Sequence, residues 1–72
     1  MKPGDLLEWD DDALRAGDYT LDEGDAVAPF IIVEVDEHQE GFISGEVRLL
    51  DSRGRLLRYD MTLLKELTRR LG

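Results

Sequence analysis

Apolar and polar residues alternate with a period of two in several short segments of this chain, which predicts β-strands. The longest of these segments, residues 28–36, contains the largest β-branched apolar run and leads into a polar cluster. Such a run is typical of a central strand that enters a turn. Residues 6–9 predict a first strand with Leu7 and Trp9 on one face. We therefore expect a small antiparallel sheet organised around residues 28–36.

The two faces of the central strand both begin with apolar residues, and only one turns polar, at Glu34. This pattern favours a closed barrel in which one face fills the interior and a loop or helix partly covers the other. We expect Phe30 and Ile32, which share the face of Glu34, to lie outside the barrel. The opposite face consists of Ile31, Val33 and Val35.

The second half of the chain predicts a hairpin. Residues 42–50 alternate as a third strand, and Gly45 interrupts them where a bulge would let a small sheet close. Residues 51–54, Asp-Ser-Arg-Gly, are typical of a type I turn with glycine in the left-handed position. Residues 55–59 then return as a fourth strand.

The period changes at Asp60, after which leucines recur at helical spacing. Asp60 is a suitable N-cap, and basic residues near the end favour the helix dipole, so residues 61–70 predict a short C-terminal helix. An alternative makes residues 61–64 a single turn and residues 65–70 a last strand that pairs with the first. Together the segments predict a single domain over residues 1–72, mainly β, with four to five strands in a small antiparallel barrel.

An acidic segment without a clear period separates the first two strands. It covers residues 10–26, contains few apolar residues, and is interrupted by glycines. One helical turn at residues 13–16, capped by Asp12, fits the pattern. Long connections in small domains are commonly functional or disordered. We therefore expect this segment to be the most mobile or the most dependent on a partner.

Charge is divided unevenly along the 72 residues, whose formal net charge is -8. Residues 1–47 contain fourteen acids and two bases, whereas residues 48–72 contain seven bases and three acids. Net negative charge disfavours nucleic acid and anionic membranes as partners. There is no cysteine, no apolar stretch that could span a bilayer and no signal-peptide pattern, so we expect a soluble protein of a reducing compartment.

Several segments resemble the small Src-homology-3-like (SH3-like) β-barrel proteins of tailed bacteriophages. The similarity rests on the opening Lys-Pro-Gly-Asp-Leu-Leu of residues 2–7, the apolar residues 32–35, the hairpin of residues 47–54 and the leucine-rich residues 59–64. The long acidic segment and the helical tail depart from that pattern. The resemblance implies an SH3-like barrel, to which the spacing of the leucines adds a short C-terminal helix, and it implies a location in the host cytoplasm or the virion.

Catalytic chemistry has little support in the sequence. His38 is the only histidine and lies in a charged turn, and the serines have no evident base beside them, so we do not expect an enzyme. Neither Asp10–Asp12 nor the acids at residues 22–25 have the spacing of a calcium loop. We therefore expect no metal site and no cofactor.

The combined pattern favours a non-catalytic protein-interaction module, a phage virion or accessory component that binds a protein partner or associates with itself. The alternative is an acidic protein that mimics DNA and inhibits a host nucleic-acid-binding protein. The first hypothesis assigns partner binding to apolar residues outside the barrel, and the second assigns it to the acidic segment. The candidate residues are Trp9, Phe30 and Ile32 for the first and Asp10, Asp11, Asp12, Asp22 and Glu23 for the second.

Overall fold

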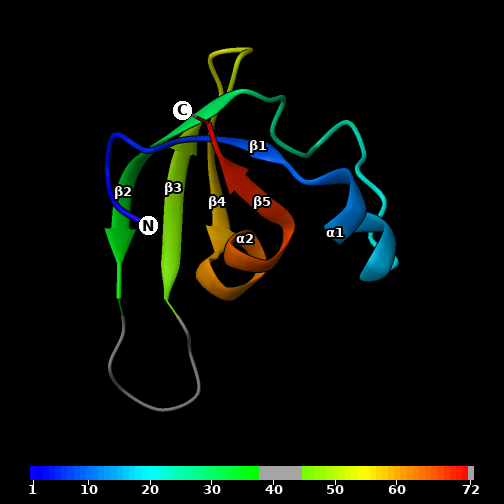
Figure 1. The fold of residues 1–72 in the computed structure, drawn as a ribbon. Helices are drawn as coiled ribbons and strands as arrows, with labels where there is room; N and C mark the ends of the chain where they lie inside the picture. Colours follow the sequence, from blue (N-terminus) through cyan, green and yellow to red (C-terminus); the bar gives the residue numbers. More distant parts are fainter. Residues whose placement is uncertain (38–44, 72) are drawn as a thin grey trace.

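The computed structural model of the chain describes residues 1–37 and 45–71 (Figure 1). Within these residues it contains five strands and two short helices, which confirms a mainly β fold. Neither helix in residues 1–37 and 45–71 is long and apolar enough to cross a membrane. The elements in chain order are β1 (Leu6–Trp9), α1 (Asp11–Ala16), β2 (Phe30–Asp36), β3 (Glu46–Leu50), β4 (Leu56–Asp60), α2 (Met61–Leu67) and β5 (Thr68–Arg70).

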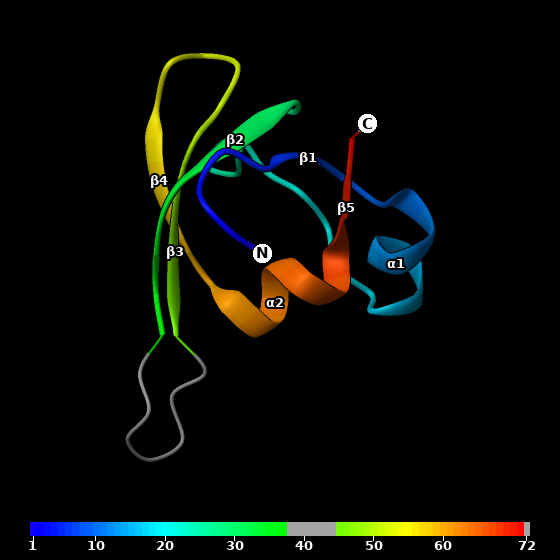
Figure 2. The ribbon, with the colours of Figure 1, turned by 60° about the vertical axis from the view of Figure 1, so that its left-hand side comes forward.

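The strands form one antiparallel sheet in the order β4-β3-β2-β1-β5. Strands β4 and β5 are its two edges and do not pair with each other in the described part of the chain, so the closed barrel expected from the sequence is not formed. Helix α2 lies between the end of β4 and the start of β5 (Figures 1 and 2). The sheet is therefore open on the side that α2 occupies.

The C-terminal segment combines the two structures that its sequence allowed. Asp60 is the N-cap, as predicted, and its side chain accepts a hydrogen bond from the Leu63 N–H at 3.2 Å. The helix ends at Leu67, so the expectation of a helix to residue 70 is wrong. Thr68 adopts an extended backbone, and Thr68–Arg70 pair with β1 as the alternative required. This pairing satisfies the backbone N–H and C=O groups along the edge of β1, which would have no strand partner if the helix continued to residue 70.

The hydrophobic core lies between one face of the sheet and helix α2. We call this the inner face of the sheet. Phe30 and Ile32 are each 1% exposed, so the expectation that they lie outside is wrong. The rest of the buried apolar set comes from the other strands, both helices and the acidic segment: Leu7, Trp9, Leu14, Ala26, Val47, Leu49, Met61, Leu64 and Leu67.

The hairpin of β3 and β4 follows the sequence closely. The turn at residues 51–54 is confirmed, since Gly54 has a φ of +78° and its N–H donates to the Asp51 carbonyl at 3.0 Å. Gly45 also has a positive φ, +116°, and a Cβ there would meet Met61 and the Asp36 backbone at under 3.0 Å. The expected start of the third strand at residues 42–44 and the turn that contains His38 lie outside the described residues.

Helix α1 begins two residues before the predicted turn. Its N-cap is Asp10 instead of Asp12, because the Asp10 carboxylate reaches the Asp12 and Ala13 N–H groups at 3.1 and 3.3 Å. Asp12 lies in the first helical turn, where acidic side chains are favourable but do not cap. Residues 17–26 then have no regular structure, as predicted, and the central strand expected from residue 28 begins at Phe30.

Candidate interaction face

The outer face of the sheet, opposite the core, carries a continuous row of exposed aliphatic side chains. Leu6 pairs with Ile31 across β1 and β2, Ile31 pairs with Leu50 across β2 and β3, and Leu50 pairs with Leu56 across β3 and β4. Paired residues on neighbouring strands point to the same side, so all four lie on one face. We call them the outer apolar row. Their exposed fractions are 41%, 38%, 41% and 60% in that order.

The ladder between β2 and β3 is irregular beside this row. Its register shifts between Ile32 and Glu34, where Val33 is the extra residue. Val33 is also exposed. A strand with an inserted residue bends and twists more strongly, and bulges are common where a side chain is directed outward. The irregularity therefore extends the exposed apolar surface along β2.

Charged residues on the outer face beyond the row are arranged in pairs. Arg48 lies 3.3 Å from Glu34 across the β2–β3 ladder, and Arg58 lies 3.2 Å from Glu46 across the β3–β4 ladder. Both pairs are solvent-exposed, so each contributes little to folding. Their effect on the surface is greater, because opposite charges side by side leave this part of the face without a strong net field.

The sequence-predicted apolar candidates are located on the other side of the sheet. Trp9 is 8% exposed, and its ring packs against Phe30 with the ring centroids 5.3 Å apart. Together with Ile32, these residues form part of the core and offer little surface to a partner. Sequence reasoning therefore missed the outer apolar row, although Ile31 and Val33 had been placed on one face. Only the strand register shows that Leu6, Leu50 and Leu56 continue it.

The acidic candidates are divided between two places. Asp10, Asp11 and Asp12 lie at the start of α1, and Asp10 is used as its cap. Asp22 belongs to a turn in which its carboxylate accepts from the Gly24 N–H at 2.8 Å. Glu23 is exposed in the same turn. Within the described residues no group of acids and histidine has an arrangement that could hold a metal ion.

A buried carboxylate fixes the end of the acidic segment to the β3–β4 turn. Asp51 accepts hydrogen bonds from the N–H groups of Val27, Arg53 and Arg55 at 2.9–3.0 Å, and from the Arg55 guanidinium. Burial by itself raises the pKa of Asp51, but these donors outweigh burial and lower the pKa to about 2. Arg55 also donates to the carbonyls of Glu23 and Asp25. The segment is therefore held at a fixed position against the hairpin.

A second set of contacts fixes the segment to the core through Tyr59. The Tyr59 hydroxyl accepts from the Ala26 N–H at 2.8 Å and donates to Asp25 at 2.9 Å. The Trp9 indole N–H donates to the Ala26 carbonyl at 2.8 Å. Burial raises the pKa of Tyr59, and the neighbouring Asp25 carboxylate raises it further; the same two causes raise the pKa of Tyr19. This polar network completes the core and gives no sign of a reactive group.

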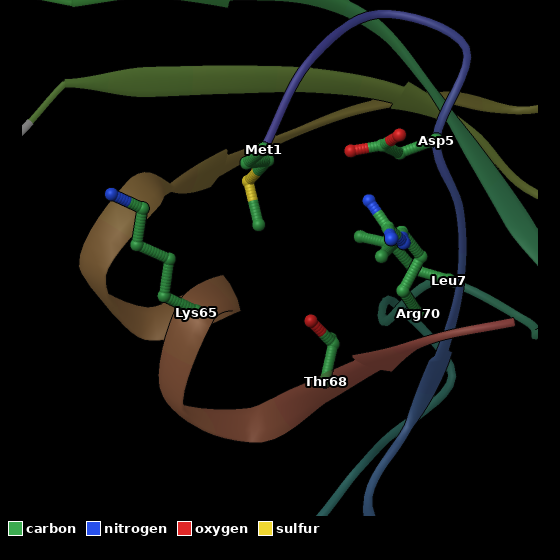
Figure 3. A pocket seen from close by; sticks show the side chains of 6 residues that line it. All are labelled: Met1, Asp5, Leu7, Lys65, Thr68 and Arg70. Atoms are coloured by element: carbon green, nitrogen blue, oxygen red, sulfur yellow. The ribbon is translucent and has the colours of Figure 1, made fainter.

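A shallow pocket of about 270 Å³ opens between the N-terminal residues and the C-terminal segment (Figure 3). Asp5, directly before β1, and Arg70, in the neighbouring strand β5, border the pocket, and the Thr68 side chain points into it. The Asp5 carboxylate accepts from the Lys2 N–H at 3.0 Å, and the Thr68 hydroxyl donates to the Leu64 carbonyl. The polar groups of the pocket are thus partly used within the protein, and its charges are mixed in sign. The lining residues are Met1, Asp5, Leu7, Lys65, Thr68 and Arg70.

Comparisons of the chain with protein-family models, with curated proteins and with solved structures found no match. A functional proposal has to be based on the protein itself. Its most distinctive surface feature is the outer apolar row.

Proposed function

We propose that this chain is a non-catalytic protein-interaction module that binds its partner through the outer face of the sheet. The observation that carries this proposal is the outer apolar row, Leu6, Ile31, Leu50 and Leu56, aligned in register across four strands and exposed in each. Contiguous exposed apolar surface is typical of interaction sites, whereas single exposed apolar residues are common on any protein. Neutralised charge beside the row lowers the desolvation cost of covering it.

The resemblance to phage SH3-like proteins supports a role as a virion or accessory component of a tailed bacteriophage. The support from the fold is limited to a small, mainly β sheet of five antiparallel strands; the helical tail, like the acidic segment, departs from the pattern of that family. We therefore propose that the fold is an SH3-like sheet that stays open at α2.

The test is affinity capture from phage-infected bacteria with tagged wild type, Leu50→Glu and Leu21→Glu. Leu21 is a matched control, because it is 37% exposed against 41% for Leu50 but belongs to the acidic segment. We expect Leu50→Glu to lose a captured protein that Leu21→Glu retains, and Leu56→Glu to behave like Leu50→Glu. The affinity of the purified complex should not weaken steeply as salt is added. Retention of the captured protein by both row variants would contradict the proposal.

The second candidate function, an acidic DNA-mimicking inhibitor, is favoured by one structural observation. Residues 10–25 contain seven acids and one base, and Arg55 and Tyr59 hold the end of this segment in a fixed position. A rigid array of carboxylates is what such mimicry requires, since an unordered one would lose entropy on binding.

Charge reversal at Asp11, Asp12 and Glu23 tests this second function. The carboxylates of these residues accept no hydrogen bond within the described part of the chain, so their replacement by lysine should preserve the fold. If the inhibitor hypothesis is correct, the lysine variant loses its partner and wild-type binding weakens steeply with salt. An unchanged affinity of the lysine variant would exclude this function.

A further inference from the structure

We propose that the outer apolar row is the contact between two copies of this chain, which associate face to face as a symmetric dimer. This inference rests on the proposed function and names the partner. It follows from three properties of the face: the sequence of side chains along the row, the distribution of charge over the molecule and the size of the surface.

The row is suited to two-fold symmetry. Across the sheet the row consists of Leu6, Ile31, Leu50 and Leu56. Leucine stands at both ends, and isoleucine and leucine stand between them. A symmetric interface requires a surface that is complementary to itself. Aliphatic side chains of similar size meet this requirement, because a two-fold rotation that packs the row on its copy opposes apolar groups everywhere. Two sheets packed in this way lie about 10 Å apart, with their side chains interdigitated.

The distribution of charge permits two acidic molecules to meet at this face. Residues 10–25 carry seven acids and one base, a net charge of -6 out of -8. Helix α1, at the start of this segment, lies beyond α2 and β5 from strands β3 and β4 in both views (Figures 1 and 2). The end of the segment is bound by Asp51 and Arg55, which contact it on the inner side of the hairpin. The outer face instead has the pairs Glu34–Arg48 and Glu46–Arg58.

The acidic segments of two face-to-face copies would thus be kept apart. At physiological ionic strength, charges separated by more than about 8 Å are largely screened from each other. Repulsion between the copies should therefore be weak in physiological salt and stronger in low salt. Self-association through the row should tighten as salt is added, whereas binding of a basic partner to the acidic segment should weaken.

The size of the face sets the strength of the dimer. The protein measures 31 × 27 × 25 Å, so its broadest side is comparable to the area of about 800 Å² per partner that a standard stable interface buries. A contact centred on four side chains covers only part of that side. We therefore expect a reversible dimer whose population depends on protein concentration.

The first experiment is sedimentation velocity of wild type, Leu50→Glu and Leu21→Glu over a concentration series in low and physiological salt. We expect wild type and Leu21→Glu to shift from monomer to dimer, with more dimer in the higher salt. Leu50→Glu should weaken dimerisation by at least about 10-fold, because it places a charge at the centre of an apolar contact. Circular dichroism checks that each variant is folded, and Leu56→Glu, at the edge strand, replaces Leu50→Glu if that variant unfolds.

The second experiment uses the absence of cysteine from the chain. Ile31→Cys and Leu21→Cys each introduce a single thiol at positions of matched exposure, 38% and 37%. We expect Ile31→Cys and Leu50→Cys, mixed under mild oxidation, to form disulfide-linked dimers much faster than Leu21→Cys, since the dimer brings the rows together. Equal rates for the row and the control would overturn the proposal.

The outcomes separate this inference from the proposed function. A wild-type protein that stays monomeric at millimolar concentration overturns self-association, even if Leu50→Glu still abolishes capture of another protein, in which case the proposed function stands. A dimer that Leu50→Glu and Leu56→Glu leave intact also overturns it, because the contact must then lie elsewhere.

Discussion

Both faces of the sheet carry aliphatic residues, yet these residues have opposite environments on the two faces. Ile31 and Ile32 are neighbours in β2, yet Ile32 is 1% exposed and Ile31 is 38% exposed. The inner face is covered by α2, and the outer apolar row has no covering element in the described part of the chain. The difference shows that apolar composition alone does not decide which face of a strand is buried.

What distinguishes the inner face is the set of elements that converge on it. Trp9 and Phe30 supply large rings from β1 and β2, and Leu64 of α2 belongs to the same buried cluster. The polar groups at the border of this cluster are bonded, as for the Trp9 indole on the Ala26 carbonyl. The outer apolar row has no aromatic ring and no helix packed on it in the described part of the chain. It is therefore open to contact with a second molecule.

The largest effect expected from this comparison is that of truncating the buried isoleucine. Ile32→Ala should destabilise the fold by about 2–5 kcal/mol, because it leaves a cavity in a core that cannot fully collapse. Ile31→Ala, one residue away, should cost about 1 kcal/mol because its side chain is already partly in water. Urea denaturation of the two variants at low protein concentration measures both. Equal losses would mean that the outer face is as tightly packed as the inner one.

The sequence predicts much of this fold because its local signals are strong. Alternation located β1 at residues 6–9, the Asp-Ser-Arg-Gly turn located the hairpin, and Asp60 located the start of α2. The division of the tail between α2 and β5 was harder to predict from the sequence. The leucines continue at helical spacing, but pairing with β1 ends the helix at Leu67. Pairing partners are distant in sequence, and no local pattern encodes them.

The candidate face was missed for a related reason. Both sides of β2 are apolar, so the two-residue period cannot choose between Phe30 and Ile31. Glu34 suggested that its own side faced solvent, but the register shift at Val33 breaks the alternation between Ile32 and Glu34. Likewise no local pattern showed that Asp51 accepts a hydrogen bond from the N–H of Val27, the residue that follows the acidic segment, because the two are distant in sequence.

A large effect is also expected at Asp51, on the inner side of the hairpin. Asp51→Asn should lower the melting temperature markedly, because an amide cannot accept from all the donors that the carboxylate binds. The pKa of Asp51 is lowered from 3.8 to about 2 in the folded protein. Its contribution is therefore complete above pH 3.8 and is lost as the pH falls toward 2.

Thermal denaturation of wild type and Asp51→Asn across this acidic range measures the contribution. The difference between their melting temperatures should narrow as the pH falls. A difference that stays constant down to pH 2 would show that Asp51 contributes packing alone.

A smaller effect is expected from removing the Tyr59 hydroxyl. Tyr59→Phe leaves the buried Ala26 N–H without its acceptor, which should cost about 1–3 kcal/mol. The pKa of Tyr59 is raised from 10.0, so the folded state keeps the phenol protonated and its stability falls as the pH rises above that value. Urea denaturation at neutral pH and a titration to alkaline pH test both effects. Tyr59→Phe should lose less stability than wild type on the alkaline side.

The smallest effect is expected on the outer face, at the pair Glu34–Arg48. Both side chains are about half exposed, so their coupling in a double-mutant cycle with Glu34→Gln and Arg48→Gln should be about 0.2–1 kcal/mol and should decrease with salt. This holds for a monomer, in which water screens the pair. If two copies cover the outer face, the coupling should grow with protein concentration, because the same charges then interact across a drier surface. A coupling that is independent of concentration, in a sample shown to be dimeric, would place the dimer contact away from β2 and β3.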